Sequence, residues 1–253
     1  MSKVIAISNQ KGGVGKTTTA VNLAASFAAL EKTTLLIDMD PQGNASQGLG
    51  FNEAQDEDIH ELLDLAANPD QLSYENIKNS ILNTKLEYLK VITAAPDLAA
   101  LEIELVQAMS REFRLKRIID ILKPYFEFII IDAPPSLNLL TINTLTASNS
   151  VLIPVQCEYY ALQGLAELFN TIRLVQKNLN SNLKIEGALL TMYDNRLTLS
   201  KQVAEEVRNC ISEKVFNTLI PRNVKLGEAP SHGKPILEYE PRNKGTIAYL
   251  NLA

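Results

Sequence analysis

The sequence predicts an α/β fold: a single domain over residues 1–253, with a mostly parallel, twisted sheet and helices on both faces. Three observations support this prediction. Continuous apolar runs, typical of fully buried strands, alternate along the chain with segments of helical periodicity. No Pro- or Ser-rich linker, internal repeat or low-complexity tract divides the chain. The 253 residues, 46% of them hydrophobic, are enough to bury a sizeable core.

The first elements follow directly from these patterns. Residues 3–8 form a short apolar run that predicts a strand, and residues 16–30 have helical periodicity. The apolar side chains of that helix share one face, at Ala20, Leu23, Ala24, Phe27 and Leu30. Residues 33–40 predict a second buried strand, because the apolar run stops at a proline and a glycine. The less regular stretch 52–88 predicts two short helices, and 89–95 predicts the next strand.

The second half of the chain continues the alternation. Residues 97–123 predict one long helix that ends at a proline, and 126–135 predict a strand rich in Ile and Phe. The remaining elements are a helix at 136–148, a strand at 150–155, a helix at 160–180, a strand at 185–193, a helix at 199–213 and a strand at 214–221. The tail from residue 222 is rich in Pro and Gly, so we expect mostly loop there, with a short helix near 245–252.

Charge is unevenly distributed. The net charge of −5 argues against a protein that coats nucleic acid by default. Residues 1–172 carry a net −9 and residues 173–253 a net +4. A basic C-terminal third is compatible with a phosphate-binding patch, although charge alone slightly favours ordinary variation of a solvated surface.

Cysteine usage and targeting signals indicate a cytoplasmic protein. Cys157 and Cys210 lie far apart without metal or redox spacing, so a disulfide framework is not expected. The N-terminus has no cleavage-site pattern, and no apolar stretch approaches the roughly 20 residues that a membrane span needs.

A glycine-rich loop between the first strand and the first helix predicts phosphate binding. It consists of Lys11, Gly12, Gly13, Val14, Gly15, Lys16, Thr17 and Thr18. Glycines let successive N–H groups point at phosphate oxygens, and the helix N-terminus adds its positive dipole end. Lys16 is expected to meet the β- and γ-phosphates, and Thr17 to meet Mg²⁺. Gln10 stands where the usual pattern has a glycine, and Lys11 follows it as a second lysine. A simple tight connection would not need this combination of residues, so the loop predicts that the single α/β domain is a P-loop NTPase domain.

Carboxylates at the ends of two other predicted strands complete the expected site. Asp132 follows an Ile-rich run and fits the Walker-B role of holding Mg²⁺ through water. A cap on the following proline turn is the less favoured interpretation. Asp40 is placed to orient the attacking water, and Asp38 is a further candidate for the metal shell, with a purely structural role given even odds.

The motifs resemble those of the ParA/Soj family of DNA-partitioning ATPases, within the ParA/MinD superfamily. The lysine-fronted loop KGGVGKTTTAVNLA is similar to the deviant Walker-A motif. The segments LLIDMDPQGNASQGLG, FIIIDAPPSLNLLTINTLTAS, IPVQCEYYALQGL and IPRNVKLGEAPSHGKPI are similar to the ParA/Soj branch. The resemblance covers nearly the whole chain.

This resemblance implies a dimeric switch that uses ATP and Mg²⁺. Lys11 matches the signature lysine that reaches the nucleotide of the other subunit, and Gly12 lies where the two loops approach. Asp40 matches the residue that positions the attacking water. The segment Pro221, Arg222 and Asn223 matches a loop that contacts the adenine.

The resemblance also implies partners. The ATP homodimer binds double-stranded DNA without sequence preference, and it associates with the nucleoid in that state. Arg196 and Lys225 match DNA-contacting positions, and weaker candidates are Lys201, Arg222 and Arg242. Lys225 stands where an arginine is more usual, which keeps the charge but loses the fork geometry. A ParB/Spo0J-type protein stimulates hydrolysis, which drives partitioning of a chromosome or plasmid.

Other functional classes fit less well. A membrane-cycling ATPase of the MinD type would carry a basic amphipathic C-terminal helix, which KGTIAYLNLA is not, so no membrane partner is expected. An iron protein would need suitably spaced cysteines, and a signalling GTPase would need an NKxD motif. A degenerate, non-enzymatic adaptor would be expected to lose Lys16, Thr17 or Asp132. His60 and His232 have no partner pattern and are interpreted as ordinary loop or surface residues.

Overall fold

A single twisted sheet organises the chain. The computed structural model describes residues 2–53, 55, 57–158, 161–211 and 214–253. Within these residues, seven strands pair in the order β3-β4-β2-β5-β1-β6-β7, and every described pairing is parallel except that of β3 with β4. The strands are β1 (Lys3–Ile7), β2 (Thr34–Asp38), β3 (Leu82–Asn83), β4 (Leu89–Ile92), β5 (Phe128–Asp132), β6 (Ser150–Gln156) and β7 (Lys184–Thr191). The predicted fold class is confirmed.

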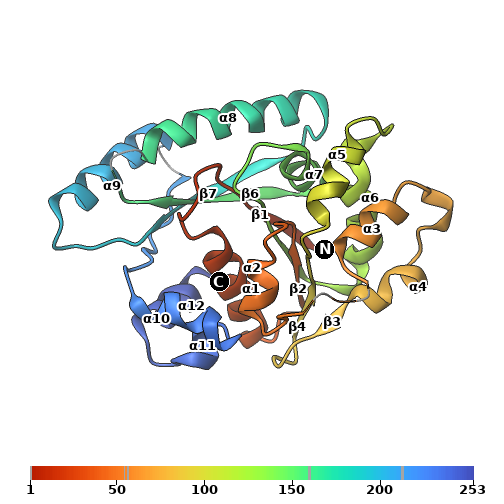
Figure 1. Cartoon of the computed structure of the whole chain (residues 1–253). Coiled ribbons are helices and arrows are strands. Elements are labelled where there is room, and N and C mark those ends of the chain that lie inside the picture. Colours follow the sequence, from red (N-terminus) through yellow and green to blue (C-terminus); the bar gives the residue numbers. More distant parts are fainter. Residues whose placement is uncertain (1, 54, 56, 159–160, 212–213) are drawn as a thin grey trace.

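Helices cover both faces of this sheet (Figure 1). The helices are α1 (Lys16–Ala29), α2 (Asn44–Gly48), α3 (Ile59–Leu65), α4 (Tyr74–Ile77), α5 (Leu98–Leu105), α6 (Arg114–Leu122), α7 (Leu139–Ala147), α8 (Ala161–Asn178), α9 (Thr198–Ile211), α10 (Val224–Glu228), α11 (Ile236–Tyr239) and α12 (Lys244–Leu252). One face packs against α1, α11 and α12. The other packs against α3, α5, α6 and α7 over one half of the sheet and α8 and α9 over the other half.

Parallel pairing brings the functional strand ends together. The register pairs Ile7 with Asp132 and Asp38 with Asp132, so the carboxyl ends of β1, β5 and β2 lie side by side. These strands are central and fully covered, and the core side chains Val4, Ile37 and Ile131 have no exposed surface. The phosphate loop therefore begins at the edge of the sheet where parallel α/β proteins bind ligands.

Two predicted elements are wrong. The helix predicted at 97–123 is two helices, α5 and α6, because the chain turns between them and Ser110 adopts a left-handed φ of +51°. The strand predicted at 214–221 is an irregular segment with isolated bridges at Val215 and Pro221. It bends at the polar residue Asn217, while Phe216 packs close to Gly187.

The C-terminal tail is also more ordered than predicted. The expected helix near 245–252 is present as α12, but α10, α11 and a 3-10 turn (Ala229–His232) occupy most of the stretch that was expected to be loop. Asn223 and Asn243 cap α10 and α12 by accepting hydrogen bonds from the backbone N–H groups of Lys225 and Gly245. These short helices depend on packing against α1 rather than on their own propensity.

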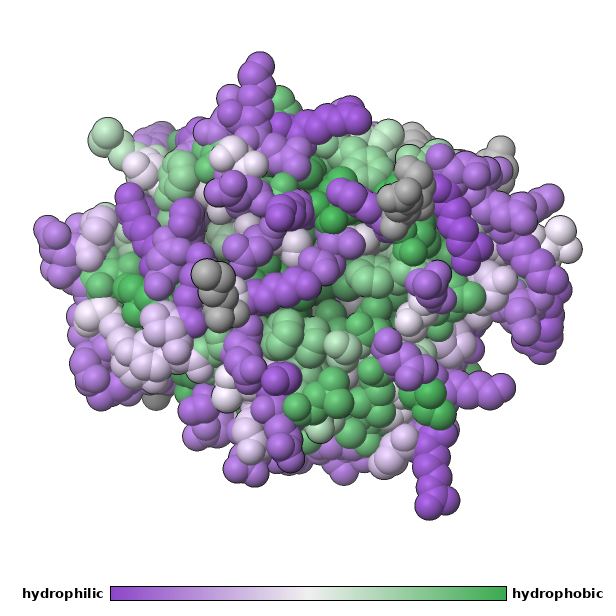
Figure 2. Space-filling view, turned by 180° about the vertical axis from the view of Figure 1, so that it is seen from behind, coloured by the Kyte–Doolittle hydropathy of each residue, from purple (hydrophilic) through white to green (hydrophobic). Residues whose placement is uncertain are grey.

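Other predictions have smaller outcomes. Helix α2 and strand β3 were not predicted, whereas the two short helices within 52–88 are confirmed as α3 and α4. Residues 160 and 212–213, at the ends of two predicted helices, lie outside the described residues. Among the helices described, none has both the length and the apolar character that crossing a bilayer requires. Seen from behind, polar side chains cover most of the surface and surround an apolar hollow near its lower centre (Figure 2).

Candidate nucleotide site

The phosphate loop has the backbone conformation that its glycines permit. Gly13 and Gly15 have φ values of +73° and +87°, in the left-handed region that other residues rarely adopt. Gly15 is the N-cap of α1, so the free N–H groups of the first helical turn face the loop. The loop is fixed from the end of β7, because the Thr191 hydroxyl donates to the Val14 carbonyl oxygen over 2.8 Å. The predicted loop is therefore shaped as an anion cradle.

The two lysines of the loop occupy different places. Lys16 is 6% exposed, and its Nζ donates to the carbonyl oxygen of Lys11 over 3.2 Å. Burial lowers the pKa of Lys16, and the charges of Asp132 and Asp40 oppose that change. Lys11 lines a separate open groove at the front of the loop, together with Gln10. The described lining of the main cleft includes Lys16 but not Lys11.

Asp132 is a buried carboxylate without a hydrogen-bond partner. It has no exposed surface, and neither of its oxygens has a partner among the described residues. Burial raises its pKa well above the usual range, and the charge of neighbouring Asp38 adds to the rise. The hydroxyl of Thr17 lies close enough to oppose the rise, although its geometry falls short of a hydrogen bond. Such an uncompensated oxygen donor beside a hydroxyl fits a hard divalent cation such as Mg²⁺.

Asp38 is held differently from Asp132. Its Oδ2 accepts from the Ser46 N–H and the Ser46 hydroxyl, both over 2.8 Å, and its Oδ1 accepts from the Asp40 N–H over 3.1 Å. Burial nevertheless raises the pKa of Asp38 to about 6. The Ser46 hydroxyl in turn accepts from the Ala94 N–H over 3.1 Å. These bonds favour the structural interpretation of Asp38, as an anchor for α2 beneath the site.

Asp40 faces the main cleft from the turn that follows β2. Its Oδ1 accepts from the Gln42 N–H over 3.0 Å, which fixes the side chain, and it is 7% exposed. The cleft is about 530 Å³ in volume. The lining includes Gly12, Gly13, Gly15, Lys16, Thr17, Thr18, Asp40, Pro135 and Lys234. The structure thus brings together the phosphate loop and Asp40, as the sequence predicted.

A second cleft of about 260 Å³ adjoins the first and shares Gly15, Thr18 and Met192 with it. Pro221, Arg222 and Asn223 line this cleft, beside Gly15 and Thr18 of the loop. The Asn223 side chain is already engaged, because its Oδ1 caps α10 and its Nδ2 donates to the Asn243 Oδ1 over 2.5 Å. Contact of Asn223 with a base would therefore be through its backbone.

Several residues of the site were not predicted. Met192 has a left-handed φ of +50° where the two clefts meet, and such strain is often found at functional positions. Asn22 is 5% exposed and lines the main cleft. Its Nδ2 donates to the Thr18 carbonyl over 2.7 Å, and its Oδ1 accepts from the Ile236 N–H over 2.7 Å. Thr191 could have been found, because a polar residue at the carboxyl end of a predicted parallel strand is a signal.

The candidate DNA contacts lie on the surface, and two of them are ion-paired. Arg196 pairs with Asp194, and Lys225 pairs with Glu228. The backbone N–H of Arg222 donates to the Tyr193 carbonyl over 3.1 Å, which places Arg222 beside the Arg196 segment. Lys201 is exposed on α9, and Arg242 is exposed in the turn before α12.

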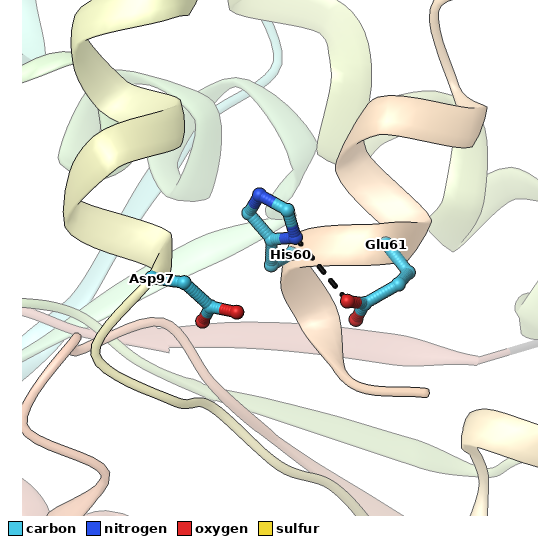
Figure 3. A group of neighbouring side chains, drawn as sticks. All are labelled: His60, Glu61 and Asp97. Atoms are coloured by element: carbon cyan, nitrogen blue, oxygen red, sulfur yellow. Dashed lines mark hydrogen bonds and ion pairs between the residues drawn. The ribbon is translucent and has the colours of Figure 1, made fainter. Parts of the chain in front are cut away.

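The two histidines have closer neighbours than the sequence indicated. The ligand atoms of His60, Glu61 and Asp97 lie within 4.8 Å of one another at the start of α3 and α5 (Figure 3). Glu61 is already used there, because it completes a capping box with Asp58 at the start of α3. His232 stacks on Tyr239 with ring centroids 4.9 Å apart.

Fold and site together define a P-loop nucleoside triphosphatase. A family model described as an AAA domain matches residues 2–185. The sporulation initiation inhibitor protein Soj of Bacillus subtilis is 56% identical, with 100% of this chain and 97% of that protein covered. The chromosome partitioning protein ParA of Myxococcus xanthus is 52% identical, with 100% and 87% covered. The chain belongs to the Soj/ParA family of chromosome-partitioning ATPases. Its cofactors are ATP and Mg²⁺, since similar solved structures hold ADP or an ATP analogue with magnesium.

Solved structures agree with this assignment. Cobyrinic acid a,c-diamide synthase from Mycobacterium smegmatis, with bound ADP and magnesium, has a TM-score of 0.84 and 35% identity, covering 99% of this chain and 92% of that one. A putative plasmid partition protein from Borrelia burgdorferi, bound to AMPPNP, has a TM-score of 0.77 and 27% identity, covering 100% and 99%.

Proposed function

We propose that this protein is an ATP-dependent dimeric switch that binds DNA non-specifically and hydrolyses ATP, under stimulation by a ParB/Spo0J-type partner, to drive chromosome or plasmid partitioning. The observation that supports this proposal best is the division between the two loop lysines. Lys16 faces the cleft of its own subunit, whereas Lys11 lines an outward groove with Gln10. A lysine that faces away from its own cleft is placed to reach a nucleotide held by a second subunit.

Within one subunit, the chain's own groups hold and orient ATP. The loop N–H groups and the Lys16 ammonium bind the phosphates, and Thr17 and Asp132 hold Mg²⁺, the latter through water. Bound Mg²⁺ neutralises charge that develops on the phosphate oxygens. Asp40, fixed by the Gln42 N–H, orients the attacking water. The segment Pro221–Asn223 contacts the adenine from the adjoining cleft.

The front of the loop is open for a second subunit. A Cβ built on Gly12 meets no atom within 4 Å, so the space there is unfilled by the chain itself. We propose that the loop of the partner subunit enters this space and that Lys11 reaches across to the partner's ATP. A side chain at Gly12 would obstruct this approach.

Hydrolysis in the isolated protein should be slow. The described lining of the main cleft contains Lys16 and Lys234 but no arginine, and an arginine finger strongly accelerates phosphoryl transfer. We propose that a ParB/Spo0J-type protein supplies the missing stimulation. DNA binding by Arg196 and Lys225, with Lys201, Arg222 and Arg242 as further candidates, depends on dimerisation, because doubling the number of neutralised phosphates raises affinity steeply.

The first experiment measures DNA binding by Asp40→Ala, which should hold ATP without hydrolysing it. A random-sequence duplex is titrated with ATP, with ADP or without nucleotide, at two salt concentrations. Salt-sensitive binding with ATP alone supports the switch. DNA binding that is the same with and without nucleotide would be compatible with ATPase activity but would exclude the proposed nucleotide-dependent switch.

The second experiment tests the role of Lys11. In Lys11→Ala, ATP-dependent dimerisation measured by sedimentation should be lost while monomeric nucleotide binding remains. Lys85→Ala, at an exposed lysine, serves as the control and should dimerise normally. A normal ATP dimer of Lys11→Ala would exclude the proposed reach across the interface.

A further inference from the structure

We propose that Asp194 and Glu228 are masking carboxylates, which hold Arg196 and Lys225 in intramolecular ion pairs and so keep the DNA affinity of the protein low. This inference rests on the proposed function, because that function assigns the two cations to DNA. It adds that DNA phosphates must compete with two carboxylates of the protein itself. These two masking carboxylates then determine how strongly DNA binding depends on ATP.

The Asp194–Arg196 pair has the geometry that a phosphate would require. Arg196 Nε donates to Oδ1 over 2.9 Å and Nη2 donates to Oδ2 over 2.6 Å, and the Arg196 backbone N–H adds a third bond to Oδ1 over 3.0 Å. This forked pairing uses the guanidinium edge that binds phosphate bidentately. The hydrogen bonds from Arg196 lower the pKa of Asp194 to about 2, so the carboxylate remains charged at any working pH. The Arg196 side chain is 84% exposed and the Asp194 side chain 14%.

The second pair restrains Lys225 in a similar way. Its Nζ lies 2.8 Å from Glu228 Oε2, and this carboxylate also accepts from the Tyr239 hydroxyl over 3.1 Å. The ammonium is 5.6 Å from the centroid of the Tyr239 ring. Glu228 is therefore held from two sides, which keeps it beside the lysine. The hydrogen bond to Glu228, together with the charge of that carboxylate, raises the pKa of Lys225.

Both pairs adjoin the smaller cleft. Met192 and Asn223 line this cleft, and each lies two residues from one of the paired charges, Asp194 and Lys225. The two segments are joined by the hydrogen bond from the Arg222 N–H to the Tyr193 carbonyl. A nucleotide that fills the cleft therefore contacts the segments that carry both masks. Exposed ion pairs of this kind cost little to open, as a reversible mask requires.

The masks predict a specific effect on affinity. A cation that is already neutralised adds little to the counterion release that drives non-specific DNA binding, whereas a freed cation adds one phosphate contact. Freeing two cations per subunit should therefore steepen the dependence of log affinity on log salt by about 2 per subunit. The gain should be largest without nucleotide, where the masks are expected to be closed.

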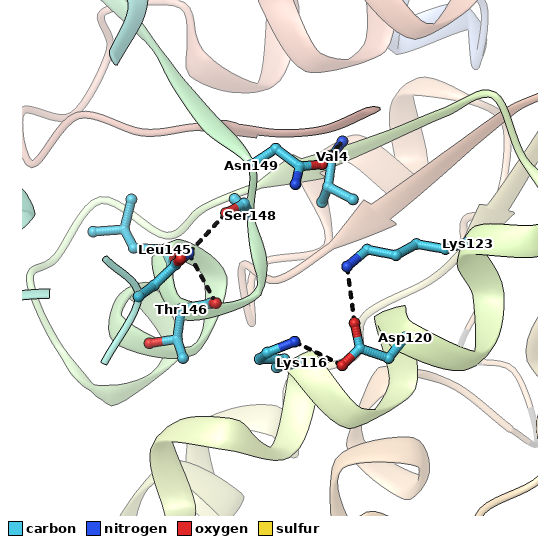
Figure 4. A network of polar contacts seen from close by, with 9 residues as sticks. Val4, Lys116, Asp120, Lys123, Leu145, Thr146, Ser148 and Asn149 are labelled. Atoms are coloured by element: carbon cyan, nitrogen blue, oxygen red, sulfur yellow. Dashed lines mark hydrogen bonds and ion pairs between the residues drawn. The ribbon is translucent and has the colours of Figure 1, made fainter. Parts of the chain in front are cut away.

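The test is the isosteric double variant Asp194→Asn/Glu228→Gln, titrated with a random-sequence duplex with and without ATP at several salt concentrations. We expect about tenfold or more tighter binding without nucleotide, and a smaller ratio between the two conditions. The control is Asp120→Asn/Glu127→Gln, which removes two ion-paired carboxylates elsewhere. Asp120 lies between Lys116 and Lys123 on α6 (Figure 4), and Glu127 pairs with Lys32. The charge change is identical, so an equal gain in the control would overturn the proposal.

A second pair of variants separates the inference from the function beneath it. Arg196→Ala/Lys225→Ala should weaken DNA binding, and adding Asp194→Asn/Glu228→Gln to it should give no gain. If the alanine variant binds DNA normally, the DNA assignment is wrong and the masking proposal fails with it. If the alanine variant is weak but Asp194→Asn/Glu228→Gln alone binds no better than the unaltered protein, the masking proposal fails while the DNA assignment holds. Equal melting temperatures exclude unfolding as the cause.

Discussion

Replacing Asp132 by asparagine should stabilise the protein in the absence of nucleotide and metal, and the gain should grow with pH. The carboxylate is buried, its oxygens have no hydrogen-bond partners among the described residues, and it faces Asp38 across adjacent strands. An acid whose pKa is raised by folding costs nothing below its unfolded pKa and opposes folding progressively as pH rises towards its folded pKa. Asparagine has almost the same shape and removes the ionisation.

Asp38 sets the scale of the effect. Its pKa rises from 3.8 to about 6. At about 1.4 kcal/mol per pH unit, this shift corresponds to roughly 3 kcal/mol of unfolding free energy lost between pH 4 and 6. Asp132 is equally buried and lacks the hydrogen bonds that Asp38 receives, so we expect a loss of the same order that continues to higher pH. The variant should therefore exceed the unaltered protein by about 1 kcal/mol near pH 4.5 and by roughly 3 kcal/mol near pH 7.5.

Urea unfolding with a metal chelator, at several pH values between 4.5 and 7.5, measures this difference. Asp70→Asn, at an exposed carboxylate, is the matched control and should change stability by less than about 0.5 kcal/mol at every pH. The variant should also lose Mg²⁺-dependent ATP hydrolysis. A stability difference that does not vary with pH, or a variant that is less stable at pH 7.5, would refute the reasoning.

Three further changes test the support of the phosphate loop. Thr191→Val leaves the buried Val14 carbonyl without its donor and should cost about 1–3 kcal/mol in urea unfolding while weakening ATP binding in calorimetry; an unchanged urea midpoint would contradict this. Asn22→Ala removes one bond within the loop helix, to Thr18, and one bond from that helix to the C-terminal segment, at Ile236, and should lower stability by roughly 2–3 kcal/mol; an unchanged melting temperature would contradict this. Gly15→Ala forces an alanine to a φ of +87°, which costs about 1–2 kcal/mol and should abolish ATP binding. Lys85→Ala, at an exposed lysine, is the control and should have no effect in the same assays.

The sequence predicted those parts of the fold and of the site that are determined by residues close together in the chain. A strand that is buried on both faces leaves an unbroken apolar run, so the strands, and Asp132 at the end of one of them, were predicted from short segments of sequence. The lysine-fronted loop was predicted in the same way, from eight consecutive residues. Parallel pairing then places strand ends together without further information. The loop and Asp40 therefore line one cleft as expected.

Features that depend on distant contacts were missed. Helical periodicity continues through residues 97–123, but the chain turns near Ser110, where Asn143 of α7 bonds to the backbone of Arg111 and Leu115, and this distant contact is not visible in the local pattern. The role of Asp38 depends on Ser46, which lies in an unpredicted helix. Asp194 and Glu228 were missed for another reason. They lie only two and three residues from Arg196 and Lys225, so these ion pairs could have been predicted from the sequence alone.

The contacts of α1 with the C-terminal segment have a consequence for protein synthesis. Asn22 bonds to residue 236, and the Thr19 hydroxyl lies 3.2 Å from that of the buried Tyr249, so the helix behind the phosphate loop is completed by residues made more than 200 positions later. A nascent chain on the ribosome that still lacks these residues contains the phosphate loop but not the contacts that support the helix behind it. ATP binding, and any behaviour that depends on it, should therefore begin only after translation has passed Tyr249, which prevents unfinished chains from acting as switches.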